Sequence, residues 1–248
     1  MPGCGNLKQE STNRGKEGGR EEFTEIALGN RAVHLLPERA IFLPESDTLV
    51  LADLHFGKVN HFRRAGLPVP PAANQRNAER LIDLIQKMKP ARTLFLGDLF
   101  HSAYNDDWEV VGQIVRHFPA CSFVLVIGNH DILSERQYVR NGIQCVDRIS
   151  EGNVVFTHEP LEAKEVADGT INVAGHLHPA ARLTGKGRQS LVMPCFWKSE
   201  KHFILPAFGS FTGLAAIAPA ETDTVYVLVD HRILEIRPVS MGTKSASS

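Results

Sequence analysis

Short apolar runs alternate with helical patterns in the first half of the chain. Residues 47–53 form an apolar run between two aspartates, and similar runs cover 92–96 and 122–127, so each is predicted to be a buried strand. Between these runs, apolar residues recur every three or four positions over 78–88 and 108–118, which predicts two amphipathic helices. Strand, helix, strand, helix, strand is the order typical of βαβ units around a parallel sheet.

The second half of the chain contains short strand patterns and few helical ones. The candidate strands are 154–157, 171–174, 190–193, 202–205, 224–229 and 232–236. They predict a second sheet, more antiparallel or mixed, packed on the first. Because no linker separates the halves, we expect one α/β domain with two sheets over 23–238. The polar, Gly-rich segment 1–22 and residues 239–248 are predicted to be disordered tails.

Composition excludes several classes of protein. The chain has 248 residues, 43% of them hydrophobic, and a formal net charge of -1, so it is expected to fold and not to coat nucleic acid by bulk charge. No apolar run reaches the roughly 18 residues of a membrane span. The N-terminus lacks the apolar core of a secretory signal. Four scattered cysteines, without a paired spacing, indicate reduced thiols and a cytoplasmic location.

The 11 histidines are many for this length, and several of them follow the predicted strands. Polar residues cluster after the strand ends in five short segments, and ligands bind at that edge of an open α/β sheet. The residues are Asp53 and His55, Asp98 and His101, Asn129, His130 and Asp131, His158, and lastly His176 and His178. One such segment alone would be a common polar strand end, but five in succession indicate a metal centre.

The residue types and spacings fit a site for two divalent ions. Residues at i and i+2 of an extended chain point to the same side, so Asp53 and His55 are expected to grip one ion together. Carboxylate, imidazole and amide oxygen suit Mn, Fe or Zn. The ligands outnumber the needs of one ion, and two ions sharing Asp98 account for all of them. Gly97, Gly128 and Gly175 fit places where the backbone turns sharply or passes close to a ligand.

The five segments resemble the motif pattern of the calcineurin-like binuclear metallophosphoesterase superfamily: D-x-H, G-D, G-N-H-D/E, a lone His, and G-H-x-H. The resemblance implies a four-layer α/β/β/α sandwich of two mixed sheets that carries a two-metal site. It assigns Asp53, His55, Asp98 and His178 to one ion, and Asp98, Asn129, His158 and His176 to the other. It also implies that His130 faces the scissile phosphate and assists the leaving oxygen, and that Asp131 orients His130.

Further strings resemble the bacterial DNA-ligase-associated metallophosphoesterases, also described as DNA damage response endonucleases. They are 51–58, 63–66, 67–70 and 205–213, and the resemblance extends over about 30–236. It implies a manganese-dependent phosphodiesterase and DNA endonuclease, encoded beside a ligase and a helicase, with single-stranded DNA as the favoured substrate. A homodimer is compatible with this resemblance.

For several residues near the motifs, the sequence is compatible with two different roles. Lys58, Arg63 and Arg64 form either a positive rim that binds phosphate or a solvated helix face. His101 either contacts substrate or starts a helix at the surface. The aromatic segment 208–211 either stacks on a base or packs in the core.

The sequence thus predicts a phosphodiesterase acting on nucleic acid, linked to DNA repair. The alternative is the same chemistry on a small nucleotide or a phosphomonoester. A scaffold without catalysis would require lost metal ligands, and none of the motif positions is substituted.

Overall fold

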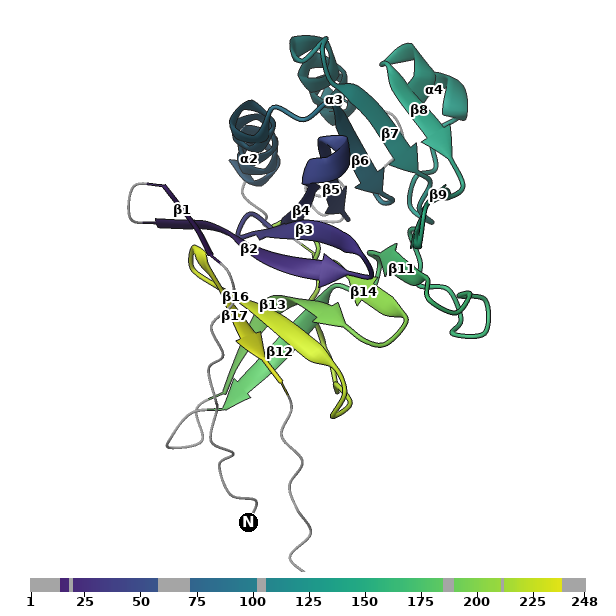
Figure 1. The fold of residues 1–248 in the computed structure, drawn as a ribbon. Coiled ribbons are helices and arrows are strands. Elements are labelled where there is room, and N and C mark those ends of the chain that lie inside the picture. The colour runs from purple at the N-terminus through teal and green to yellow at the C-terminus, as the bar shows by residue number, and fades with distance from the viewer. Residues whose placement is uncertain are drawn as a thin grey trace, which may run out of the picture.

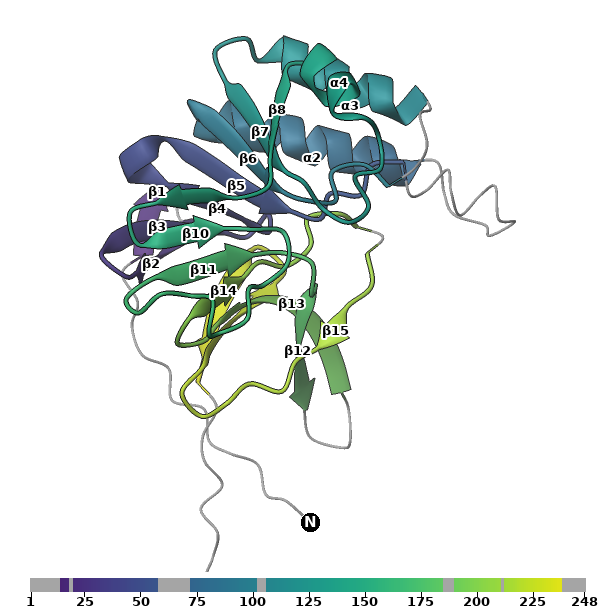
Figure 2. The same cartoon turned by 90° about the vertical axis from the view of Figure 1, so that its right-hand side faces the viewer.

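Two β-sheets lie face to face, and helices cover the outer face of the first sheet (Figures 1 and 2). This is a computed structural model. It describes residues 14–17, 20–57, 72–101, 106–184, 190–210 and 212–237.

The first sheet has eight strands in sequence order. They are β1 (Arg14–Glu17), β2 (Arg20–Leu28), β3 (Arg31–Leu36), β4 (Ala40–Leu43), β5 (Thr48–Ala52), β6 (Arg92–Leu96), β7 (Ser122–Val126) and β8 (Ile143–Val146). Strands β1 to β5 pair antiparallel, with the short 3-10 helix η1 (Pro44–Ser46) before β5. Strands β5 to β8 are parallel. The βαβ pattern predicts this for β5 to β7, and β8 is an addition that the pattern did not indicate.

In the described part of the chain, three α-helices connect the parallel strands: α2 (Ala72–Met88), α3 (Asp106–His117) and α4 (Glu135–Arg140). Helix α2 contains the first predicted amphipathic segment, and α3 contains the second except for Phe118. Helix α4 has six residues, too few to show a helical period, and begins with a capping box in which Ser134 and Gln137 satisfy each other's backbone amides.

The parallel strands end at the same level, which determines where the site lies. Ala52 of β5 pairs with Leu96 of β6, and Leu96 pairs with Val126 of β7. All three residues are fully buried. The segments that follow them therefore leave the sheet side by side at one edge.

The second sheet has nine strands. They are β9 (Ile149–Glu151), β10 (Val154–Phe156), β11 (Ile171–Ala174), β12 (Pro179–Thr184), β13 (Ser190–Lys198), β14 (His202–Ile204), β15 (Ala215–Ala216), β16 (Thr224–Val229) and β17 (Arg232–Ile236). Strand β11 lies parallel between β10 and β14, and β13, β16 and β17 pair antiparallel. The sheet is mixed, as predicted.

Apolar side chains fill the space on both sides of the first sheet. Val50 and Leu96 share one core with Phe156 of the second sheet, while Trp108 and Tyr138 belong to a second core under the helices. The α/β class with two mixed sheets is confirmed. Within the described residues no α-helix follows α4, and residues of β12 together with Ile217 pack against a small cluster that includes Cys195.

The strand pairing extends into the segment predicted to be a tail. Strands β1 and β2 form an antiparallel pair, so β-structure begins at Arg14 rather than at residue 23. The sequence did not predict these two strands, because they are largely polar. Their pairing depends on the partner strand and not on an apolar run. Residues 239–248 lie outside the described stretches. Among the described helices, none combines the length and apolar character that crossing a membrane requires.

An ion-pair cluster joins the two sheets at the end opposite to the ligand-binding edge. Arg92, at the start of β6, places Nη2 2.6 Å from Oε1 of Glu151 in β9, and its Nε donates to Thr48 Oγ1 at 3.2 Å. Arg31 Nη1 lies 3.5 Å from the other carboxylate oxygen of Glu151.

Candidate metal centre

The five polar segments predicted to form the site converge between the two sheets. Three follow β5, β6 and β7 of the first sheet, and two follow β10 and β11 of the second. Their imidazole and carboxylate atoms form two groups, each with its ligand atoms within 4.8 Å of one another.

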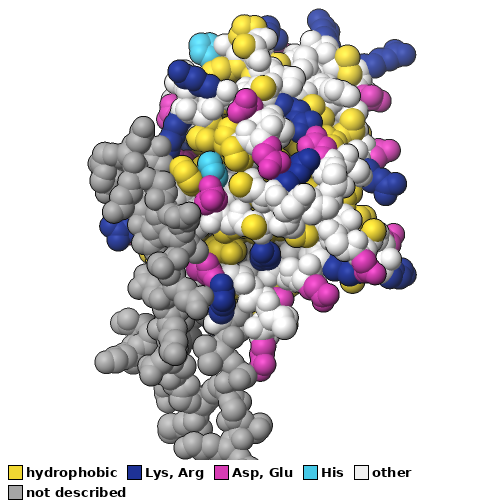
Figure 3. Space-filling model, viewed as in Figure 1, with side chains coloured by type: hydrophobic (Ala, Val, Ile, Leu, Met, Phe, Trp, Pro, Cys, Tyr) yellow, Lys and Arg dark blue, Asp and Glu magenta, His cyan; other side chains and the backbone are white. Residues whose placement is uncertain are grey.

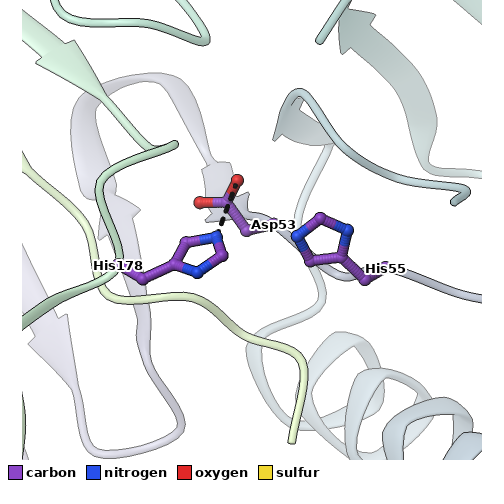
Figure 4. Close-up of side chains that lie close together, drawn as sticks. All are labelled: Asp53, His55 and His178. Atoms are coloured by element: carbon purple, nitrogen blue, oxygen red, sulfur yellow. Dashed lines mark ion pairs between the residues drawn. The ribbon is translucent and has the colours of Figure 1, made fainter. Parts of the chain in front are cut away.

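The first group consists of Asp53, His55 and His178 (Figure 4). His178 Nε2 lies 3.5 Å from Asp53 Oδ1. The other ring nitrogen, Nδ1, lies 3.1 Å from the carbonyl oxygen of Gly213 and must donate there, because a carbonyl only accepts. The lone pair of Nε2 therefore points toward Asp53. Asp53 is 0% exposed, and its Oδ1 has no hydrogen-bond partner among the described residues.

The second group consists of Asp98, His158 and His176. His158 Nδ1 donates to the Leu96 carbonyl at 3.0 Å, which leaves a lone pair on Nε2. That nitrogen lies 2.9 Å from Asn129 Oδ1 and 3.5 Å from Asp98 Oδ1. Electron-rich atoms thus face one another, an arrangement that a cation would satisfy.

Asp98 lies between the two groups. Its Oδ1 faces His158 of the second group, and its Oδ2 lies 3.7 Å from His55 Nε2 of the first. Oδ1 also accepts the backbone amide of His130 at 3.0 Å. In the described stretches neither Asp53 nor Asp98 pairs with lysine or arginine, although both are at most 2% exposed. Two buried carboxylates without a cation would be costly, so the site's electrostatics favour bound metal.

The backbone at the site is not extended, which corrects one argument from the sequence. Asp53 and His55 have φ of 55° and 50°, so they converge by left-handed turns and not by strand alternation. Three other site residues also have a left-handed backbone with positive φ: Asp98, His176 and His178. Such backbone costs energy and persists where neighbours fix it, as where His55 N donates to the Asp98 carbonyl at 2.8 Å.

The three predicted glycines pack directly against site residues. A Cβ at Gly97, which has φ of 70°, would overlap the ring of His158. A Cβ at Gly128 would overlap Asp98, and one at Gly175 would lie 2.6 Å from Asp53 Oδ2. The expectation of close approach is therefore confirmed at all three positions.

His130 is half-buried and lies beside two other imidazoles. Its ring centroid is 3.9 Å from that of His101 and 5.8 Å from that of His55. His101 therefore lies beside the predicted site residues, and its contact with substrate stays a prediction.

Asp131 does not hydrogen-bond the His130 ring, contrary to the sequence expectation. Its buried carboxylate accepts from the amides of Phe100 and Gly128, at 3.1 and 2.9 Å, and from the Tyr138 hydroxyl at 3.3 Å. Burial raises the pKa of Asp131 to about 6. Asp131 therefore ties the loop after β6 to the loop after β7, and short sequence distance from His130 gave the wrong partner.

Other predicted residues have simpler outcomes. Lys58, Arg63 and Arg64 lie outside the described residues. Phe208 is fully buried, which confirms packing for that part of the aromatic segment. The three described cysteines are free, and burial raises the pKa of Cys195 to about 12.

The sequence did not indicate two contributors to the site. One is the Gly213 carbonyl, since a backbone acceptor leaves no side-chain signal. The other is the stretch 207–210, whose Phe208 and Gly209 amides donate to the carbonyls of Ala52 and Asp53 at 2.8 and 3.1 Å. The resemblance included 205–213 but gave this stretch no contact with the ligand segments. Gly209 is the signal for close packing, because a Cβ there would lie 2.6 Å from the Leu54 carbonyl.

A two-sheet α/β fold with two carboxylate–histidine groups at one sheet edge defines a binuclear metallohydrolase. A family model described as calcineurin-like phosphoesterase matches residues 47–226. The chain belongs to this family and is a metal-dependent phosphoesterase.

Solved structures give further comparisons. The nuclease MPE of Pseudomonas putida is 27% identical, with a TM-score of 0.72, and the match covers 86% of this chain and 100% of that one. Yfce, a phosphoesterase from E. coli, is 14% identical with a TM-score of 0.42, covering 77% and 98%. AQ665 of Aquifex aeolicus, a protein of unknown function, is 18% identical with a TM-score of 0.39, covering 57% and 82%. The comparison with curated proteins gave no match.

Proposed function

We propose that the chain is a two-metal phosphodiesterase that cuts DNA as an endonuclease, with single-stranded DNA favoured and a role in repair. The observation that carries the proposal is the pair of ligand groups joined by Asp98, with His130 beside them. The similarity of the whole Pseudomonas putida nuclease to this chain supports nucleic acid as the substrate.

The residues present fit two divalent ions. Asp53 Oδ1 is buried without a hydrogen-bond partner in the described part of the chain, and the lone pair of His178 Nε2 points at it. Around His158 Nε2, an amide oxygen and a carboxylate oxygen gather. Asp53, His55, His178 and Asp98 would hold one ion, and Asp98, Asn129, His158 and His176 the other. This mixed oxygen and nitrogen set suits manganese, with iron or zinc also compatible.

When bound, a pair of divalent ions neutralises phosphate oxygens and activates water for attack on phosphorus. The chain's own contribution is to hold the reacting groups in place and to supply a proton. The described contacts of the His130 ring are with the rings of His55 and His101, and not with the carboxylates of the two ligand groups. His130 is therefore the residue that would protonate the leaving oxygen. His101, whose ring centroid lies 3.9 Å from that of His130, would contact the same phosphate.

The proposed biological setting follows from the DNA-ligase-associated resemblance. It comprises a cytoplasmic enzyme working with a ligase and a helicase. Over the face in Figure 3, basic and acidic side chains are interspersed, so DNA contact is expected to be local to the site. Lys58, Arg63 and Arg64, next along the chain from His55, are proposed to bind the phosphate backbone.

A substrate panel with manganese-loaded protein tests the proposal. We expect nicking of circular single-stranded DNA, and a loss of roughly 10²–10⁴-fold in that rate for His130→Ala with metal content unchanged. His117→Ala is the matched control, since His117 is exposed on α3 and contacts only Phe118 among the described rings. Hydrolysis of phosphomonoesters or small nucleotides without DNA cleavage would contradict DNA as the substrate. It would favour the alternative function, a phosphoesterase acting on small nucleotides or phosphomonoesters.

A further inference from the structure

Residues 207–210 and 212–213, here the bracing segment, cross from the second sheet to the first beside the metal centre. It lies between β14 and β15 and turns under the first sheet before returning (Figure 2). Its Phe208 and Gly209 amides donate to the carbonyls of Ala52 and Asp53. The segment thus continues the hydrogen bonding of β5 just where the first ligand leaves the strand.

Arg80 of α2 holds the start of this segment. Its Nη1 donates to the Phe208 carbonyl at 3.0 Å, and its Nη2 donates to the Glu38 carbonyl at 3.0 Å. The guanidinium carbon also lies 4.4 Å from the centroid of the Phe208 ring. Burial lowers the pKa of Arg80 to about 10, so the group stays charged at neutral pH. A planar fork can serve both carbonyls and the ring at once, which a lysine cannot do.

Asn77, one turn earlier on α2, holds the next part. Its Oδ1 accepts from Ser210 twice, from the backbone amide at 3.2 Å and from the hydroxyl at 2.8 Å. Asn77 is 4% exposed, so its side chain is committed to this contact. Thr212 then donates its hydroxyl to the Gly209 carbonyl at 3.1 Å, which ties the turn together.

The far end of the segment acts on a metal ligand. The Gly213 carbonyl accepts from His178 Nδ1 at 3.1 Å, which fixes the ring and leaves the Nε2 lone pair for the first ligand group. Removing such an outer partner of a ligating histidine typically weakens metal binding 10–100-fold.

We propose that Arg80 and Asn77 are positioning residues for the first metal site, because they hold the bracing segment whose Gly213 carbonyl orients His178. The inference rests on the two-metal site of the proposed function but not on its substrate. It predicts that one ion, the one held by Asp53, His55 and His178, depends on α2 while the other does not.

Calorimetric titration of metal-stripped full-length protein with manganese tests the positioning role of Arg80 and Asn77. Arg80→Ala and Asn77→Ala are each expected to weaken one of two sites about 10–100-fold and to leave the other unchanged. Asn77→Asp keeps an acceptor for Ser210 and should restore tight binding. Arg92→Ala is the matched control: it removes a half-buried arginine with an ion pair and a hydrogen bond, but at the opposite end of β6.

Double variants identify the site. Combining Arg80→Ala with His178→Ala should add no further loss, whereas combining it with His176→Ala should weaken both sites. Unchanged binding in both single variants, or equal weakening of both sites, would overturn the inference. If Arg80→Ala does not fold, the comparison of manganese binding by Asn77→Ala and Asn77→Asp is sufficient to test the inference. Failure of the wild-type protein to bind two ions would instead overturn the proposed function.

Discussion

At the scale of residues, the site depends on backbone shapes that side chains rarely adopt. Motif spacing placed all seven candidate ligands correctly near one another, because strand ends meet at one edge. It could not predict the left-handed turns at Asp53 and His55, since only the packed loops determine them. It also gave Asp131 a partner one residue away, whereas burial directs that carboxylate to Phe100, Gly128 and Tyr138.

Gly97→Ala should be more harmful than Gly169→Ala, although both glycines have left-handed φ, 70° and 75°. The backbone cost of about 1–2 kcal/mol is common to both. At Gly97 the added Cβ also overlaps the His158 ring, which should cost about 1–3 kcal/mol more and lower manganese content, while nothing lies within 4 Å at Gly169. Denaturant unfolding and metal analysis measure these effects, and equal losses in the two variants would speak against the packing argument.

Tyr138→Phe should destabilise the protein by about 1 kcal/mol, because it removes the hydroxyl that donates to buried Asp131. The ring contact with Trp108 remains, so the core is kept. Denaturant unfolding gives the free energy. Tyr226→Phe is the control, because no hydrogen bond from the Tyr226 hydroxyl to a carboxylate is described, and a loss of similar size there would contradict the assignment.

At the scale of elements, the parallel strands β5 to β7 and helices α2 and α3 were predictable from periodicity. The elements β1 to β4, β8, β9, β12, β15 and α4 were not. Strands β1 and β2 carry many polar residues and are defined by their partners. Strand β4 and helix α4 have only four and six residues, too few for a period to show. The sheets are joined at both ends: by metal ligands at one edge, and by Arg31, Arg92 and Glu151 at the other.

Glu151→Ala should therefore cost about 1–2 kcal/mol of stability and leave manganese binding unchanged, since it breaks the ion pairs far from the ligands. Chemical unfolding and the titration described above measure the two quantities. Exposed Glu221, in the turn before β16, offers a control position at which Ala should have little effect on either. A loss of metal binding in Glu151→Ala would show that the two ends of the sandwich are coupled.

At the scale of the whole molecule, the formal charge of -1 omits the ions that the site is built to hold. Their binding to the folded state alone should raise the melting temperature, since ligand binding stabilises by about 2.7 kcal/mol at 100 times Kd. We expect a chelator to lower the melting temperature and excess manganese to restore it. Asp98→Asn, which removes a charge shared by both groups, should largely abolish the manganese response. An equal response in that variant would place the ions elsewhere.

The most direct measurement of the central claim is anomalous diffraction from crystals grown with manganese. Two peaks about 3.5–4 Å apart are expected. One should lie among Asp53, His55 and His178, the other among Asn129, His158 and His176, with Asp98 between them. A single peak, or peaks away from these residues, would contradict a two-metal phosphoesterase site.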